Sequence, residues 1–425
     1  MVPIHPKVMD VLIYFVQRPR EVVTADQLIE AVWGDESVSS NNIVQHVSLV
    51  RRTLGDTRKP FVYIATVPGK GYRFVAEEPR FIRNVEAIVA PSQIEQANLA
   101  AEQFHHNGRY FLGIRTEAAL FSAIELFMRA IHLNPQDARS YAGIAQAHMI
   151  LAVYLYSEPE TSFDTAEKYA RQALAIDSSN AEAYSALGAA AFFRWKDFAR
   201  AHRYLDKAGE LDPGMAQIAT VRTQVLAAEQ RFDAALSVAL EGSKANPDLT
   251  LLRSLVGFVH FARRDYAAAA LSLSPLLAID PVLTHPRFYL GLTYLFSGEI
   301  AKARAELEHV CAQNFQPLQA MQTNLRQQAM AALCFLEARF GAKSRAHDHL
   351  SALRAMQRTR HVSPYALAVC LCGLGRYEEM FARLKHAMAI GDPWAAFINI
   401  SPYFDGQRSE REFLKLAGSE AASAA

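Results

Sequence analysis

Apolar residues recur along this chain in two different patterns, and the change between them divides it into two parts. Up to about residue 76, short helical stripes precede a β-branched and aromatic pattern typical of strands. From about residue 97 onward the pattern is helical, rich in alanine and nearly free of strand-like alternation. We therefore expect a mostly α-helical protein, with a first domain at 1–78, a linker at 79–96, a helical array at 97–417 and a disordered tail at 418–425.

The helical part repeats itself. Prolines that follow aspartate or asparagine recur at 213, 247 and 281, a step of 34 residues, and alanines at 235, 269 and 303 keep this step, as do Gly257 and Gly291. Small residues let the two helices of a hairpin approach closely, and a bulky residue is expected to begin each second helix: Phe198, Phe232, Tyr266 and Ile300. The spacing resembles that of tetratricopeptide repeats. The resemblance implies an α-solenoid of stacked helical hairpins.

Further repeats end near residues 135 and 177, and another follows Gly373, whereas helices without a register are predicted between about 316 and 361. One repeat is predicted to have a stretched first helix around 154–161, and such an insertion often marks the binding face of an array. The concave groove of a solenoid holds a protein, a peptide or a small effector. An architectural or self-associating array fits the sequence equally well.

Three helices and a hairpin are predicted in the first domain. The helix at 5–17 has its apolar stripe at Val8, Val11, Leu12, Phe15 and Val16. The second helix follows the capping pair Thr24 and Gln27, buries Leu28, Ile29, Val32 and Trp33, and ends at Gly34. The third helix, at 41–54, buries Ile43, Val47, Val50 and Leu54.

The outer side of the third helix is rich in amides and ends in arginine: Asn41, Asn42, Gln45, Ser48 and Arg52. A side-chain amide can form two hydrogen bonds with adenine, and arginine can bond phosphate or guanine, so this face suits a major groove, although an ordinary solvated face has a similar composition. Two strands at 61–67 and 72–76, joined by 68–71, follow it. Residues 39–76 contain six basic residues and a single acid, Asp56, in a chain of net charge +1. The basic surface is therefore local.

These segments resemble the OmpR/PhoB-type winged helix-turn-helix, in LIEAVWG at 28–34, VSLVRRTL at 47–54 and YIATVPGKGYRF at 63–74. The resemblance implies that the helix at 41–54 is the recognition helix and that 68–72 is the tip of the wing. It implies that Gln45 and Leu49 face bases, and that Asn42, His46, Arg52 and Thr66 face bases or phosphates. The residues expected to contact DNA are Asn41, Asn42, Gln45, His46, Ser48, Leu49, Arg51, Arg52, Thr66, Lys70 and Arg73.

The sequence departs from this family at two places. Family members usually have a small sheet before the first helix, of which only residues 2–5 remain here, so we expect the linker around Phe81 and Ile82 to cover the back of that helix. Pro68 stands where the family often has a minor-groove arginine, and Lys70 is expected to substitute for it. With no receiver domain ahead of the winged helix, phosphorylation is not the expected switch. The combination with C-terminal repeats resembles the HilA-like regulators of virulence or invasion genes.

Other chemistry is not indicated. The cysteines lack the paired spacing of a zinc site, and His347 and His349, like Cys370 and Cys372, stand two apart on helices and point in different directions. Residues 68–71 lack the spacing of a phosphate loop, and no catalytic motif occurs, so neither an enzyme nor a cofactor is expected. No signal peptide or membrane-spanning stretch is recognised, which predicts a soluble, cytoplasmic protein.

The sequence thus predicts a DNA-binding transcriptional regulator, expected to be an activator. Double-stranded DNA and RNA polymerase are its expected partners, and the repeats are expected to hold a protein, a peptide, a small effector or a second copy of the chain. The alternative hypothesis is a protein-interaction scaffold whose winged helix no longer binds DNA.

Overall fold

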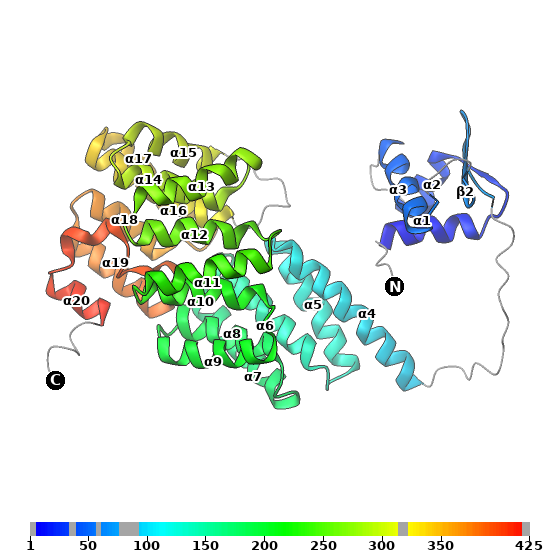
Figure 1. Cartoon of the computed structure of the whole chain (residues 1–425), viewed down its shortest axis with the longest axis horizontal. Helices are drawn as coiled ribbons and strands as arrows, with labels where there is room; N and C mark the ends of the chain where they lie inside the picture. The colour runs from blue at the N-terminus through cyan, green and yellow to red at the C-terminus, as the bar shows by residue number, and fades with distance from the viewer. Residues whose placement is uncertain (1–5, 34–39, 57–60, 76–92, 313–321, 419–425) are drawn as a thin grey trace. The chain divides into compact units, whose positions relative to one another are not determined.

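The computed structural model describes residues 6–33, 40–56, 61–75, 93–312 and 322–418. The chain divides into two compact units, 1–90 and 91–425, and each has a hydrophobic core of its own. The first unit combines helices with a small sheet, and the second is helical (Figure 1). This confirms the predicted fold class of a winged helix-turn-helix followed by an α-solenoid.

The first unit contains the helices and strands α1 (Pro6–Val16), β1 (Val22–Val23), α2 (Ala25–Trp33), α3 (Ser40–Thr53), β2 (Ile64–Val67) and β3 (Gly71–Phe74). The sheet is antiparallel, with β3 between β1 and β2. The predicted capping pair is present, because the Thr24 backbone N–H donates to Gln27 Oε1 at 2.9 Å and the Gln27 N–H donates to Thr24 Oγ1 at 3.2 Å.

Strand β1 was not predicted from the sequence. Two residues are too few to show the alternation by which strands are recognised. The strand exists because Val22 pairs with Arg73 and Val23 with Tyr72, on the edge of β3 that the hairpin leaves open. Arg20, with a left-handed φ of 66°, turns the chain toward this edge and donates its backbone N–H to the Phe74 carbonyl at 2.9 Å.

Helix α1 packs one face into the core of the first unit and exposes the other. Val8, Val11 and Phe15 are buried, as the stripe predicted. Val16 was placed with them and is instead exposed, because it lies on the opposite line of the helix with Met9 and Ile13. The residues expected to complete or cover this helix, 2–5 and the linker around Phe81 and Ile82, lie outside the described ranges.

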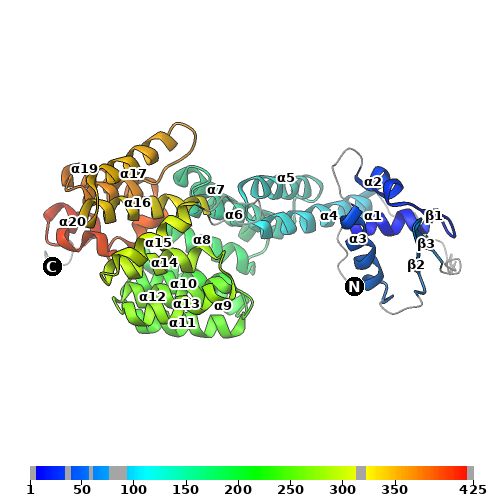
Figure 2. The same cartoon turned by 90° about the horizontal axis from the view of Figure 1, so that it is seen from above.

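The second unit contains paired helices followed by short terminal elements: α4 (Gln93–Ile114), α5 (Glu117–Leu133), α6 (Ala138–Val153), α7 (Pro159–Ile176), α8 (Ala181–Phe193), α9 (Phe198–Leu211), α10 (Ala216–Ala228), α11 (Phe232–Ala245), α12 (Thr250–Ala262), α13 (Tyr266–Ile279), α14 (Thr284–Phe296), α15 (Ile300–Ala312), α16 (Gln322–Phe340), α17 (Lys343–Met356), α18 (Pro364–Gly373), α19 (Tyr377–Ile390), the 3-10 helices η1 (Pro393–Phe397) and η2 (Pro402–Gln407), and α20 (Arg411–Ala417). Hairpins of consecutive helices stack on one another, as Figure 2 shows from above.

The predicted repeat register is confirmed in the central hairpins. The second helices α9, α11, α13 and α15 begin at the four bulky residues that the spacing predicted. The alanines three positions later are fully buried. One expectation was wrong: residues 154–161 do not lengthen a first helix but form the turn after α6 and the first residues of α7. Leu155, with a φ of 55°, takes the chain out of α6, and Pro159 suits the start of α7 because it has no N–H to satisfy.

Late elements of the second unit return to contact early ones. The Asn324 side-chain amide of α16 donates to the Val153 carbonyl of α6 at 2.7 Å, and Arg194 Nη1 donates to the Ala389 carbonyl at 2.5 Å. The Phe397 ring of η1 lies edge-on to Phe192 and Phe258, at centroid distances of 5.6 and 5.5 Å. The array therefore closes on itself.

The described residues show no helix long and apolar enough to cross a membrane. All four cysteines are free thiols. Within the described ranges, no three histidine, cysteine, aspartate or glutamate side chains gather as a metal site would require.

Close packing at the repeated small residues predicts a clear substitution effect. A Cβ at Gly257 would lie 2.4 Å from Leu273 Cδ2, so Gly257→Ala is expected to lower the free energy of unfolding by about 1–3 kcal/mol. Gly113 in α4 has nothing within 4 Å of the same position, so Gly113→Ala is expected to raise it by about 0.5–1 kcal/mol. Chemical denaturation of the full chain, followed by circular dichroism, measures both. Equal effects of the two substitutions would contradict the packing argument.

Candidate nucleic-acid interface

The outer face of α3 carries an exposed row of side chains. Gln45, Leu49 and Arg52 are exposed and follow one another at spacings of four and three, which places them on one line of the helix. Ser48 is exposed beside them, and so is Val44, which the sequence reading missed. The sequence did indicate that Val44 is exposed, because a residue one position after Ile43 lies off the buried stripe of the helix. The side chains of Asn41 and Asn42 lie outside the described residues.

His46 lies at the edge of this face and is half-buried. Its ring packs edge-on against Trp33 of α2, with ring centroids 4.9 Å apart. His46 therefore packs α3 against α2, and its side chain is less exposed on the outer face than those of Gln45 and Leu49.

Arg51 was predicted as a DNA contact, but its guanidinium bonds within the first unit. Nε and Nη2 donate to the Ile64 carbonyl at 3.0 and 2.7 Å, and Nη2 also donates to Thr66 Oγ1 at 2.8 Å. The guanidinium lies 3.7 Å from the centre of the Phe61 ring. Burial lowers the pKa of Arg51 from its usual value. The side chain therefore fastens the recognition helix to strand β2.

Asp56 supports the same junction from the end of α3. Its carboxylate accepts backbone N–H bonds from Val62, Tyr63 and Ile64, at 2.7, 3.0 and 3.2 Å. Burial acts to raise the pKa of Asp56, but these three hydrogen bonds, together with the positive charge of Arg51, hold the pKa below its usual value. Asp56, the single acidic residue of the basic segment 39–76, thus stabilises the structure. The count of charged residues in the sequence did not reveal this role.

The wing presents Thr66 and Lys70 to solvent. Lys70 stands between Gly69 and Gly71, whose φ values of 70° and 131° are ones that side-chain-bearing residues rarely adopt. A Cβ at Gly71 would lie 2.2 Å from the Val23 carbonyl oxygen, so glycine is also needed for β1 to pair with β3. These two requirements fix the shape of the tip.

Arg73 lies apart from the α3 face. It pairs with Ala65 on β2, whereas Thr66 pairs with Tyr72 and Ile64 with Phe74. Side chains alternate between the two faces of a sheet, so Arg73 projects from the face opposite to Ile64 and Thr66. Of the predicted contacts, the described structure therefore gathers Gln45, Ser48, Leu49 and Arg52 on one surface and separates Arg73 from it.

Comparison with known proteins agrees with this architecture. Residues 1–74 match the family described as "Transcriptional regulatory protein, C terminal". The segment is 37% identical over 73 residues to the transcriptional activator CadC of Escherichia coli and 36% identical over 73 residues to the transcriptional regulator HilA of Salmonella typhimurium, each covering 17% of this chain. It is 43% identical over 70 residues to YclJ of Bacillus subtilis, covering 16% of this chain.

The first unit is an OmpR/PhoB-type winged helix, which confirms the resemblance inferred from the sequence. The match spans only 14% of CadC, 13% of HilA and 30% of YclJ, so the likeness concerns this domain and not the remainder of those proteins.

Two solved structures resemble this chain in fold. Human IFIT1 with m7Gppp-AAAA superposes with a TM-score of 0.51 at 15% identity, covering 94% of this chain and 79% of that one. A monomeric IFIT1 mutant with Gppp-AAAA gives a TM-score of 0.52 at 13% identity, covering 93% and 84%. At this identity the likeness concerns the fold alone.

The Arg51 junction makes a local prediction. Arg51→Ala removes hydrogen bonds from a charged donor, and is expected to lower the free energy of local opening at 40–75 by about 1.5–3 kcal/mol. Arg52→Ala, at the exposed neighbour, is expected to change it by less than about 0.5 kcal/mol. Amide hydrogen exchange of the full chain, read from peptides within 40–75, measures the difference. Equal protection in both variants would mean that Arg51 does not hold the helix to the wing.

Proposed function

We propose that this protein is a DNA-binding transcriptional regulator that reads promoter DNA with helix α3 and the wing. The observation that carries the proposal is the exposed row Gln45, Leu49 and Arg52, with Ser48 beside it, on the recognition helix of a winged helix of known type. Two of the regulators that share this domain, CadC and the cholera toxin transcriptional activator of Vibrio cholerae, are named as activators, which supports activation here.

Each exposed side chain has a chemical task in a major groove. Gln45 can bond adenine through both the oxygen and the nitrogen of its side-chain amide, and Leu49 can pack on the methyl group of thymine. Arg52 can bond guanine or a phosphate, and Lys70 can contact phosphates from the wing. Asn41, Asn42 and Thr66 complete the proposed contact set by family resemblance, and Val44 extends its apolar part. Arg51 acts as a positioning residue.

The second unit is proposed to link DNA binding to a partner. Tetratricopeptide-type arrays present a continuous concave surface, which suits a protein, a peptide or a small effector. Recruitment of RNA polymerase and self-association belong to the same proposal, as does the absence of catalysis. The combination of a winged helix with C-terminal repeats is the basis on which a HilA-like regulator is proposed.

The phosphate contacts can be tested by salt dependence. Arg52→Ala combined with Lys70→Ala is expected to reduce the slope of log affinity against log salt by about two, because each lost phosphate contact removes about one. A matched control is Arg253→Ala with Lys385→Ala, which removes the same charge from exposed positions of the second unit. Mobility shifts of the full chain, on fragments selected from genomic DNA, measure the slope. An unchanged slope, or an equal change in the control, would overturn the assignment.

One observation favours a second function, a scaffold whose winged helix docks a protein instead of DNA. Met9, Ile13 and Val16 expose an apolar line along α1. If the full chain retains no genomic DNA at low salt, while Met9→Lys with Ile13→Lys abolishes capture of a protein partner, the scaffold is the correct reading. DNA retention that survives these two substitutions favours the regulator.

A further inference from the structure

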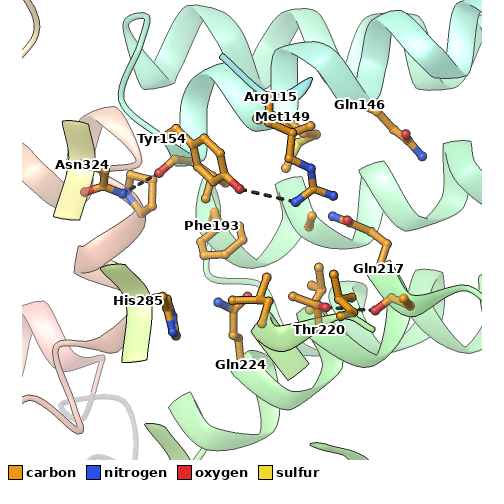
Figure 3. A pocket seen from close by; sticks show the side chains of 18 of the residues that line it. Arg115, Gln146, Met149, Tyr154, Phe193, Gln217, Thr220, Gln224, His285 and Asn324 are labelled. Atoms are coloured by element: carbon orange, nitrogen blue, oxygen red, sulfur yellow. Dashed lines mark hydrogen bonds between the residues drawn. The ribbon is translucent and has the colours of Figure 1, made fainter. Parts of the chain in front are cut away.

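A cavity of about 310 Å³ lies inside the second unit. Its walls come from the first helices of successive hairpins, α4, α6, α8, α10, α12, α14 and α16, and from η1 (Figure 3). The turn residue Tyr154, from the segment that the sequence singled out as an insertion, is part of the wall. The volume is that of a site for a small molecule.

One end of the cavity is polar and carries an unneutralised positive charge. Arg115 extends its guanidinium into the space, where Nη1 lies 3.4 Å from the Tyr154 hydroxyl (Figure 3). Arg109 is already paired with Glu182 at 2.7 Å, and Glu182 is the only acidic side chain among the described residues of the wall. The wall therefore offers Arg115 no carboxylate of its own.

A buried hydroxyl without a partner in the described structure belongs to a lobe that Arg115 also lines. A smaller lobe of about 140 Å³ shares Arg115, Gln146 and Gln217 with the main cavity and is also lined by Ser185. Ser185 is 1% exposed, and its Oγ has no hydrogen-bond partner in the described structure. A buried polar group in this state is uncommon and calls for a partner. An oxygen atom of a ligand bound near Arg115 would supply it.

The opposite end is apolar and aromatic. Phe193, Trp394 and Phe397 form much of this wall. His285 also lines it, but desolvation lowers the pKa of His285 to about 3, and its ring nitrogen Nδ1 is hydrogen-bonded to Ser254 Oγ at 2.6 Å. This end therefore carries no charge at neutral pH and suits a hydrocarbon or aromatic group.

We propose that the cavity binds a small amphipathic carboxylate, with its anionic head at Arg115 and Ser185 and its apolar body against Phe193, Trp394 and Phe397. The amides of Gln146 and Gln217 flank the head. Because η1 closes the groove at the apolar end, the site takes a compact molecule and not an extended peptide. This site goes beyond the proposed function, which assigns the array no particular ligand.

The ligand would also stabilise the closed array. Its head contacts residues near α4, α6 and α8, and its body contacts η1, so it bridges elements that are far apart in sequence. A molecule that binds only the closed arrangement favours that arrangement in proportion to its own concentration and affinity.

Calorimetric titration of the full chain without DNA tests the site. The probes are the n-alkanoates from butanoate to decanoate, each paired with the alkanol of equal length. We expect one molecule bound per chain, an optimum length, and at least about tenfold weaker binding of the alkanol, because it lacks the charged hydrogen bonds to Arg115. Thermal unfolding of the second unit should shift upward with the alkanoate.

Two substitutions separate binding from folding. Arg115→Gln is expected to weaken alkanoate binding by about tenfold or more, whereas Arg129→Gln, on the surface of α5 and away from the cavity, should leave it unchanged. Ser185→Ala removes a hydroxyl that has no partner, so it should weaken binding without lowering the thermal stability of the free protein.

Three results would overturn the proposal: no alkanoate binds, alkanol and alkanoate bind equally, or both variants keep full affinity. None of these measurements involves DNA, so their failure is distinguishable from failure of promoter binding.

Discussion

A single helical hairpin has apolar faces that it cannot bury alone, and the second unit depends on this constraint. Each hairpin is stable only against its neighbours, so the sequence must repeat small residues where helices cross. Gly257 against Leu273 and Gly291 against Leu307 are two such crossings, one repeat apart. Stacking in one direction also curves the array, and the first helices of the hairpins thereby come to share a concave side. The cavity is a consequence of that arrangement, because its walls are the same first helices.

The first unit is subject to a different constraint. Its small hydrophobic core must hold helix α3 at a fixed angle to the wing. Hydrophobic contacts are not directional and do not by themselves fix the position of α3 along the sheet, whereas hydrogen bonds do. Arg51 reaches from α3 to the Ile64 carbonyl, and Asp56 receives three N–H groups from the chain that leads into β2. Because Arg51 and Asp56 are used in this way, the proposed DNA contacts are assigned to the exposed row Gln45, Leu49 and Arg52 instead.

Features that leave a periodic pattern of side chains could be predicted from the sequence. Features that depend on hydrogen bonds to backbone atoms, or on contacts between distant segments, could not. The starts of four second helices, α9, α11, α13 and α15, were predicted to the residue, because bulky and small side chains recur there every 34 positions. Strand β1 escaped notice because Val22–Val23 has no period of its own. The role of Arg51 could not be read either, since its main acceptor is the Ile64 carbonyl and a pattern of side chains does not show carbonyls. The contacts proposed for DNA remain predictions.

The cavity was the least predictable feature, and its apolar end shows why. Trp394 stands in the wall because the buried carboxylate of Asp392 accepts its backbone N–H at 3.1 Å, and the same carboxylate accepts the Ser363 hydroxyl at 2.6 Å. Burial raises the pKa of Asp392, and these hydrogen bonds act in the opposite direction.

The Ser363 backbone N–H in turn donates to Gln327 of α16 at 2.9 Å. The position of one aromatic wall is therefore set by a chain of polar bonds that begins in another hairpin. These hydrogen bonds connect α16, α18 and η1, so a ligand that packs against Trp394 in the proposed site would contact an element that is tied to two others.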